Sequence, residues 1–179
     1  IMLNKELKLF YFIKKFSKEH FKSILKYKNL NIIYIFSNDY PVNEIINLRN
    51  ICKKHKIRFY FSSNSKIINY LKPDGIHISS KNKAKIFNIK KNIDIIGTAH
   101  NQLDYYKKIN QGCSSIFLSP LFYTSKYSNN RKLGIVKFNL LTKNWKTKVL
   151  ALGGIRKENI KKIKLTMCIG FGGISFFEK

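Results

Sequence analysis

The feature that most constrains the fold is a regular alternation of short apolar segments with amphipathic ones. Apolar runs predict eight strands: Leu9–Ile13, Asn31–Phe36, Ile57–Phe61, Gly75–Ile78, Ile93–Thr98, Ser115–Leu118, Val149–Leu152 and about Met167–Phe176. Apolar residues at helical spacing predict helices between most of them: Lys18–Tyr27, Pro41–His55, Lys66–Leu71, Asn101–Asn110 and Arg156–Lys162. Strand and helix therefore alternate eight times, at about 20 residues per unit.

Most of the predicted strands are continuous apolar runs, which is typical of parallel strands buried on both faces. Eight such units favour a compact (β/α)8 TIM barrel, and a chain of 179 residues suits a single domain over residues 1–179. That length is below the ~200–250 residues usual for this fold, and we expect no full helix after the last strand. An open, doubly wound parallel sheet is the alternative.

Small or polar residues mark the carboxyl ends of five predicted strands. These ends are Pro73–His77, Ile96–His100, Ser114–Thr124, Ala151–Ile155 and Gly170–Ile174. In a barrel of parallel strands all of them open onto the same face, which carries the active site in this fold. The sequence therefore predicts one shared functional face, with Ser114–Thr124 as its clearest edge.

The formal net charge of +26 raises the question of a nucleic-acid partner. Only four of the 35 basic residues are Arg, although Arg forks are the usual readers of phosphate and bases. The Lys residues are spread over nearly every segment, and no basic and aromatic RNA-binding motif is visible. We expect only nonspecific, salt-sensitive binding to nucleic acids.

Other features of the sequence point to an ordinary cytoplasmic protein. No run approaches the ~20 apolar residues of a membrane span, so no membrane partner is expected. Ile1–Glu6 lacks the apolar core of a signal peptide, which favours a cytoplasmic location, and Ile1 before Met2 indicates a start at Met2 or upstream. Cys52, Cys113 and Cys168 are widely spaced, so buried free thiols are expected rather than a disulfide or zinc site.

The order of the strand-end motifs resembles one family. The motifs are Asp74–Ile78, Gly97–His100, Ser119–Thr124, Ala151–Ile155 and Gly170–Ile174. They resemble the thiamine phosphate synthase/TenI family, whose usual forms are D-G-V-H-L, G-x-S-x-H, G-P-x-F-x-T, x-x-G-G-I and G-x-x-G-V. Each motif alone is weak, but five in this order are specific. The resemblance covers nearly the whole chain and implies a phosphate-binding barrel of thiamine biosynthesis.

The resemblance also implies residues that bind substrate phosphate. Gly153–Gly154 matches the turn after strand seven, whose backbone N–H groups hold a phosphate in the family, and Gly172–Gly173 matches the partner loop. Thr124 matches a threonine that contacts phosphate or pyrophosphate, and Thr98 is a further candidate for substrate binding. Lys126 offers a cation but comes one residue earlier than in the family's T-x-T-K form.

One histidine is the candidate for catalysis. His100 matches the G-x-S-x-H histidine that the TenI branch uses to move a proton during thiazole tautomerisation, and an imidazole suits that chemistry. The competing interpretation is a histidine held by backbone at the helix start, since Asn101 begins a predicted helix. His77, inside its strand, and Asp74 are expected to be structural.

The chain departs from the synthase pattern at strands two to four. The stretch Ile35–Asp39 lacks the Gln, Arg and Lys that clamp pyrophosphate in the family, although Asp39 itself is a carboxylate. A synthase implies Mg²⁺, but Ser63 and Asn82 stand where the family has the acidic residues that bind it. The sequence therefore supports no metal ligand with the usual chemistry.

Three functions remain open at this stage. The first is a thiamine phosphate synthase-like transferase, which couples hydroxymethylpyrimidine diphosphate with thiazole phosphate and releases pyrophosphate. The second is a TenI-like thiazole tautomerase, an isomerase that uses His100 and needs no metal. The third is a non-catalytic barrel that binds a phosphorylated ligand or a polyanion. The expected partners are thus small phosphorylated thiazoles and pyrimidines, and the oligomeric state is undetermined.

Overall fold

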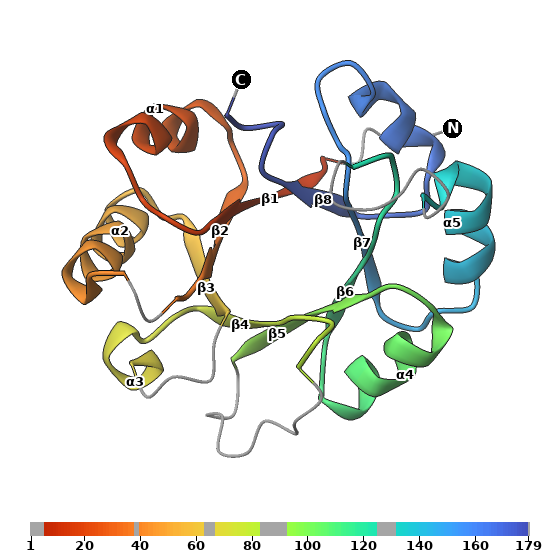
Figure 1. Ribbon diagram of the computed structural model, residues 1–179, viewed down its shortest axis with the longest axis horizontal. Coiled ribbons are helices and arrows are strands. Elements are labelled where there is room, and N and C mark those ends of the chain that lie inside the picture. Colours follow the sequence, from red (N-terminus) through yellow and green to blue (C-terminus); the bar gives the residue numbers. More distant parts are fainter. Residues whose placement is uncertain (1–5, 38–39, 63–66, 83–92, 125–131, 179) are drawn as a thin grey trace.

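Eight parallel strands close into a barrel in the computed structural model, which describes residues 6–37, 40–62, 67–82, 93–124 and 132–178 (Figure 1). The strands follow one another around the barrel in sequence order: β1 Lys8–Ile13, β2 Leu30–Ile35, β3 Arg58–Ser62, β4 Gly75–Ile78, β5 Asp94–Ala99, β6 Ser115–Leu118, β7 Lys148–Leu152 and β8 Gly170–Gly173. The predicted (β/α)8 barrel is therefore confirmed, and the open sheet is wrong because β8 pairs with β1.

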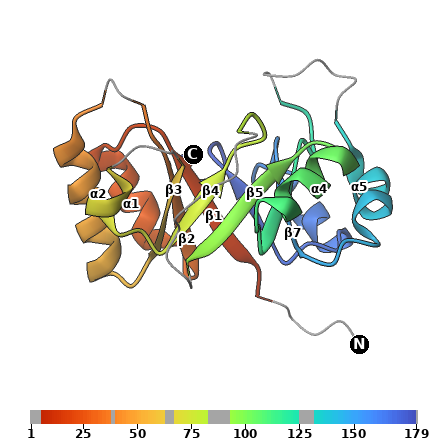
Figure 2. The same cartoon turned by 90° about the horizontal axis from the view of Figure 1, so that it is seen from below.

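Helices surround the barrel, with α1 and α2 on one side and α4 and α5 on the other in the side view of Figure 2. They are α1 Lys18–Lys26, α2 Val42–Lys54, α3 Ile68–Leu71, α4 Gln102–Asn110, α5 Gly134–Thr142 and the 3-10 helix η2 Ile160–Leu165. None of the described helices is both long and apolar enough to span a bilayer.

Alternate residues of each strand divide the core into two layers. Outward-facing residues such as Ile32, Phe61 and Ile116 pack under the helices. Inward-facing residues fill the barrel itself: Phe10, Phe12, Ile33, Tyr60, Ile96, Phe117 and Leu150. Because the strands are buried on both sides, the sequence shows continuous apolar runs rather than alternation. The barrel is consequently a packed core, and chemistry is confined to its two ends.

Three elements differ from the sequence predictions. The helix α5 was not expected, because its apolar residues lie on its exposed side, as Val136 and Leu140 do, as well as on its buried side, so that no helical period stands out. The last strand is shorter than predicted, since β8 ends at Gly173 and residues 175–177 form a turn. The helix expected at Arg156–Lys162 is the 3-10 helix η2, which begins four residues later.

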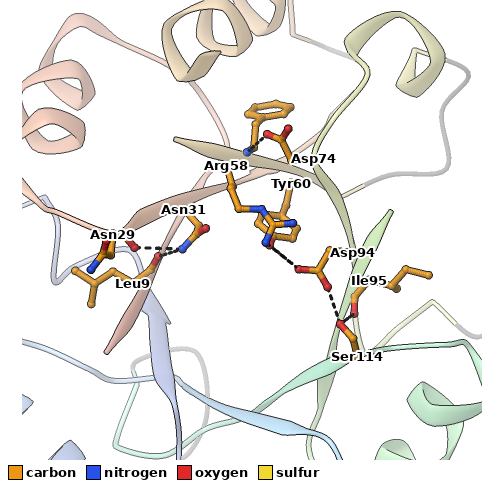
Figure 3. Close-up of polar contacts among 10 residues, drawn as sticks. Leu9, Asn29, Asn31, Arg58, Tyr60, Asp74, Asp94, Ile95 and Ser114 are labelled. Carbon is orange, nitrogen blue, oxygen red and sulfur yellow. Dashed lines mark hydrogen bonds and ion pairs between the residues drawn. The ribbon is translucent and has the colours of Figure 1, made fainter. Parts of the chain in front are cut away.

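A charged network closes the amino-terminal end of the barrel (Figure 3). The Asp94 carboxylate accepts hydrogen bonds from the Tyr60 hydroxyl at 2.8 Å and from the Ser114 hydroxyl at 2.6 Å. Arg58 adds an ion pair at 3.5 Å, and a cavity of about 390 Å³ lies beside this network. Burial alone would raise the pKa of Asp94, but the bonds from Ser114 and Tyr60, followed by the charges of Arg58 and Lys8, lower it.

Replacing Asp94 by Asn is expected to lower the free energy of unfolding by roughly 1–3 kcal/mol at pH 7. Because the folded pKa is depressed, the stabilisation by ionised Asp94 is fully present above the unfolded value of about 3.9. It is lost as the pH falls through the folded pKa. Urea titrations from pH 7 to pH 3 should therefore show a shallower decline for the variant, and parallel declines would contradict this role.

Candidate functional site

The loops after β6 and β7 are joined at the carboxyl end of the barrel. The Leu121 amide donates to the Leu152 carbonyl at 2.8 Å, and the Phe122 amide donates to the Gly153 carbonyl at 3.0 Å. Gly154 has a φ of +68°, and a Cβ added there would lie 2.3 Å from the Tyr123 carbonyl oxygen. Only glycine therefore allows this approach, which brings the predicted Gly153–Gly154 turn against the chain that leads to Thr124.

The turn at Gly154 is held in place by Asn159, and two polar groups of this region have no hydrogen-bond partner among the described residues. The Asn159 side chain donates to the Gly154 carbonyl at 2.8 Å and accepts from the Arg156 amide at 2.9 Å. Among the described residues, no group accepts a hydrogen bond from the Gly154 amide. The Thr124 hydroxyl is buried and likewise has no partner within that part of the chain. A buried polar atom without a partner is costly, which makes this turn the strongest candidate for a ligand site.

Three polar side chains meet inside the barrel at the same end. The buried His77 ring contacts the Ser62 hydroxyl through Nδ1 and the Thr98 hydroxyl through Nε2, both at 2.8 Å. Desolvation, with a smaller effect of the Lys108 charge, lowers the pKa of His77 to about 3. The ring is therefore neutral at physiological pH, so one nitrogen donates and the other accepts. Thr98, predicted to bind substrate, is thereby oriented by His77.

His100 lies between the ends of β4 and β6. Its Nδ1 is 2.8 Å from the Ser119 carbonyl oxygen, and its Nε2 is 3.0 Å from the Ser80 hydroxyl. Because a carbonyl can only accept, Nδ1 carries a proton, and in the tautomer with a single proton Nε2 accepts a hydrogen bond from Ser80. The backbone contact agrees with the competing structural interpretation, while the orientation of Nε2 is suited to a proton acceptor.

The remaining predicted phosphate ligands are placed less favourably. A Cβ added at Gly172 would lie 2.7 Å from the Phe12 ring and 2.9 Å from the Phe117 ring, so this glycine makes room for the barrel interior. Gly173 ends β8. Lys126 lies outside the described residues. The roles of Gly172, Gly173 and Lys126 in phosphate binding stay predictions.

The donor groups near the expected metal site do not suit Mg²⁺. The Asn82 carbonyl oxygen accepts hydrogen bonds from Lys108 Nζ at 2.9 Å and from Gln111 Nε2 at 3.1 Å. Within the described ranges, no three His, Cys, Asp or Glu side chains gather as metal ligands. Mg²⁺ favours carboxylates, whereas this position offers an amide and a carbonyl that already binds an ammonium group. Asp39 and Ser63 lie outside the described residues.

Two residues that the sequence assigned to structural roles lie at opposite ends of the barrel. His77 contacts the predicted substrate-binding residue Thr98 at the carboxyl end, which makes it an additional candidate there. Its signal was available, because strand alternation directs His77 inward, as it does Thr98. Asp74 does lie at the opposite end, where it accepts two hydrogen bonds from Arg49, at 2.8 and 3.1 Å.

Comparison with known proteins gives a consistent result. A family model described as thiamine monophosphate synthase matches residues 37–176. A thiamine-phosphate synthase of Prochlorococcus marinus (strain AS9601) is 31% identical over 128 residues, which cover 69% of this chain and 36% of that protein. A putative thiamine-phosphate synthase 2 of Aquifex aeolicus is 26% identical over 165 residues, covering 89% and 88%. The chain thus spans about a third of the Prochlorococcus relative but most of the Aquifex one.

A solved structure agrees with the barrel. Thiamine phosphate pyrophosphorylase from Pyrococcus furiosus superposes with a TM-score of 0.78 over 96% of this chain and 87% of that one. The sequence identity is 18%, so this likeness concerns the fold.

Proposed function

The chain belongs to the thiamine monophosphate synthase family, and on that basis we propose that it couples hydroxymethylpyrimidine diphosphate with thiazole phosphate. In this reaction the thiazole nitrogen forms a bond to the exocyclic methylene carbon of the pyrimidine. The bond from that carbon to the diphosphate oxygen breaks, and its electron pair leaves with pyrophosphate. Both substrates are small and phosphorylated, so the site must first hold phosphate.

The observation that carries the proposal is the Thr124 hydroxyl, which follows the chain packed against the Gly153–Gly154 turn and is buried with no hydrogen-bond partner among the described residues. A phosphate of the thiazole would accept a hydrogen bond from Thr124 and others from backbone amides of the turn. The Asn159 side chain keeps the turn in place through the Gly154 carbonyl. Phosphate binding would thereby satisfy groups that have no hydrogen-bond partner within the described part of the chain.

We assign no step of the reaction to Mg²⁺, because no group of suitable ligands comes together among the described residues. In the proposed reaction the protein supplies binding and orientation: Thr124 and the glycine turn hold the thiazole phosphate, while His77 fixes Thr98 at the carboxyl end of the barrel. Holding the two reactants in line lowers the entropy barrier of the coupling, which is the contribution that this geometry supports best.

The orientation of His100 favours a second candidate, thiazole tautomerisation. With Nδ1 bonded to the Ser119 carbonyl, Nε2 is the nitrogen able to take a proton from one position of the ring and return it to another. No redox step or metal is required for this isomerisation. The thiazole phosphate would bind to the same turn in both reactions.

Replacing Thr124 by Val is expected to change stability and binding in opposite directions. The free energy of unfolding of the variant should be higher by roughly 1 kcal/mol, because a buried hydroxyl without a partner among the described residues is removed. It should bind thiazole phosphate at least about 10-fold more weakly, because a charged hydrogen bond is lost. Thermal unfolding and calorimetric titration measure the two effects.

Thr147→Val provides the matched control, since the Thr147 hydroxyl is also buried without a partner among the described residues. It precedes β7 at the other end of the barrel, so the control should gain stability and keep its affinity. Equal affinity of Thr124→Val and the wild type would remove the main support for the proposed phosphate site.

Growth of thiamine auxotrophs tests the choice between the two reactions. Expression of the chain should restore growth to a strain that lacks the synthase, and Gly154→Ala should not. Rescue only of a strain that lacks the tautomerase would replace the first candidate by the second. Rescue of neither strain by a folded, expressed protein would contradict both.

A further inference from the structure

A lysine of α4 is buried at the functional end of the barrel. Lys108 is only 2% exposed, and its Nζ bonds the Ser79 carbonyl at 2.7 Å, the Asn82 carbonyl at 2.9 Å and the Gln111 side-chain oxygen at 2.8 Å. These three acceptors match the three donors of an ammonium group. Desolvation lowers the pKa of Lys108, while Cys113 and Asp104 partly oppose that effect.

None of these three acceptors is a carboxylate, and the charge of Asp104 is only a smaller effect than the desolvation of the ammonium group. A buried charge of this kind stabilises the fold less than an apolar side chain of the same size would. We therefore expect its role to lie in the groups that the ammonium holds in place.

The ammonium holds both ends of a short loop. Ser79 and Asn82 flank Ser80, and the Asn82 amide closes the turn by donating to the Ser79 carbonyl at 3.2 Å. Within this turn the Ser80 hydroxyl reaches His100 Nε2 at 3.0 Å. Lys108 therefore fixes the backbone on either side of the hydroxyl that contacts the reactive nitrogen of His100.

The barrel wall leaves room for the lysine stem. Gly97 of β5 lies beside it, and a Cβ added there would be 2.8 Å from Lys108 Cδ and 2.9 Å from Cγ. A side chain at this position would displace the stem, so Gly97 and Lys108 form a matched pair. The path of the lysine from α4 to the loop after β4 is thus determined by packing.

We propose that Lys108 is a positioning residue, which holds the Ser79–Asn82 loop so that the Ser80 hydroxyl orients His100 and keeps its Nε2 as the proton acceptor. The catalytic consequence rests on the proposed function of His100 at the thiazole site. The positioning itself is a property of the protein without substrate and has its own readout.

The test uses Lys108→Met, which keeps much of the stem volume, with Lys107→Met as the control on the exposed face of the same helix. Nitrogen NMR of protein labelled at histidine reports the tautomer and hydrogen bonding of His100, identified by its loss in His100→Asn. The wild type and the control should show Nε2 unprotonated and hydrogen bonded. Lys108→Met should shift the Nε2 resonance downfield, because the hydrogen bond that this unprotonated nitrogen accepts from Ser80 is weakened.

Ser80→Ala tests the same contact with His100 by a smaller change and replaces Lys108→Met if that variant does not fold. It should reproduce the shift of the Nε2 resonance, and the variant that combines both substitutions should show little further shift. Turnover with thiazole substrate should fall roughly 10- to 100-fold in each variant, with KM almost unchanged.

Lower thermal stability of Lys108→Met with unchanged His100 resonances would overturn the proposal and leave a purely structural lysine. Unchanged resonances in Ser80→Ala would overturn it as well. Altered resonances with unchanged turnover would support the positioning and count against His100 as the catalytic group, so the two failures are distinguishable.

Discussion

A protein in which alanine replaces Gly154 is expected to bind thiazole phosphate at least about 100-fold more weakly, a loss of roughly 2.8 kcal/mol. The residue has a φ of +68°, where an L side chain adds about 1–2 kcal/mol of strain. The new Cβ would also lie 2.3 Å from the Tyr123 carbonyl oxygen and 2.7 Å from the Phe122 backbone. The chain that carries Thr124 must therefore move away from the turn.

Gly134→Ala separates backbone strain from the collision. Gly134 has nearly the same φ, +67°, but apart from its chain neighbours no atom of the described residues lies within 4 Å of an added Cβ. Both variants should lose similar stability from strain, whereas only Gly154→Ala should lose binding in calorimetric titration. Wild-type affinity in a folded Gly154→Ala protein would show that phosphate binds elsewhere.

His100→Asn is expected to lower the rate of thiazole tautomerisation by about 10²- to 10⁴-fold, the usual contribution of a positioned acid or base. An Asn amide can still donate to the Ser119 carbonyl, as Nδ1 does, so the loop geometry should survive. The group at Nε2 is removed, and with it the proton acceptor. Incorporation of deuterium from solvent into the thiazole measures the loss.

The exposed His55 at the end of α2 provides the control, and His55→Asn should keep the full rate. His100→Gln places an amide near the Nε2 position without a basic nitrogen and should be as slow as the Asn variant. A tautomerisation rate in His100→Asn equal to that of the wild type would exclude this histidine as the catalytic base.

The barrel could be predicted because its determinants are local. Buried parallel strands leave continuous apolar runs, and small residues at their ends recur at regular intervals. Gly154 and Thr124 were predicted as site residues from the resemblance of their motifs to one family, and the tight turn that the structure shows at Gly154 explains the need for glycine there. The helix α5 could not be predicted, because it carries apolar residues on its exposed side as well as on its buried side, which erases the helical period.

The positioning of His100 could not be predicted from the sequence. In the sequence nothing distinguishes Lys108 from the many other lysines. Its burial depends on the space beside Gly97, which belongs to β5 and not to the helix of Lys108. Ser80 is a common loop residue until the barrel brings it to His100. These contacts join residues 11 to 29 positions apart, which periodicity does not report.

The most direct test of the central claim is a phosphorus NMR time course with the purified chain, hydroxymethylpyrimidine diphosphate and thiazole phosphate, with and without Mg²⁺. We expect pyrophosphate and thiamine phosphate to appear in equal amounts with the wild-type protein and not with Gly154→Ala. A folded wild-type protein that leaves both substrates intact under both conditions would contradict the proposed coupling reaction.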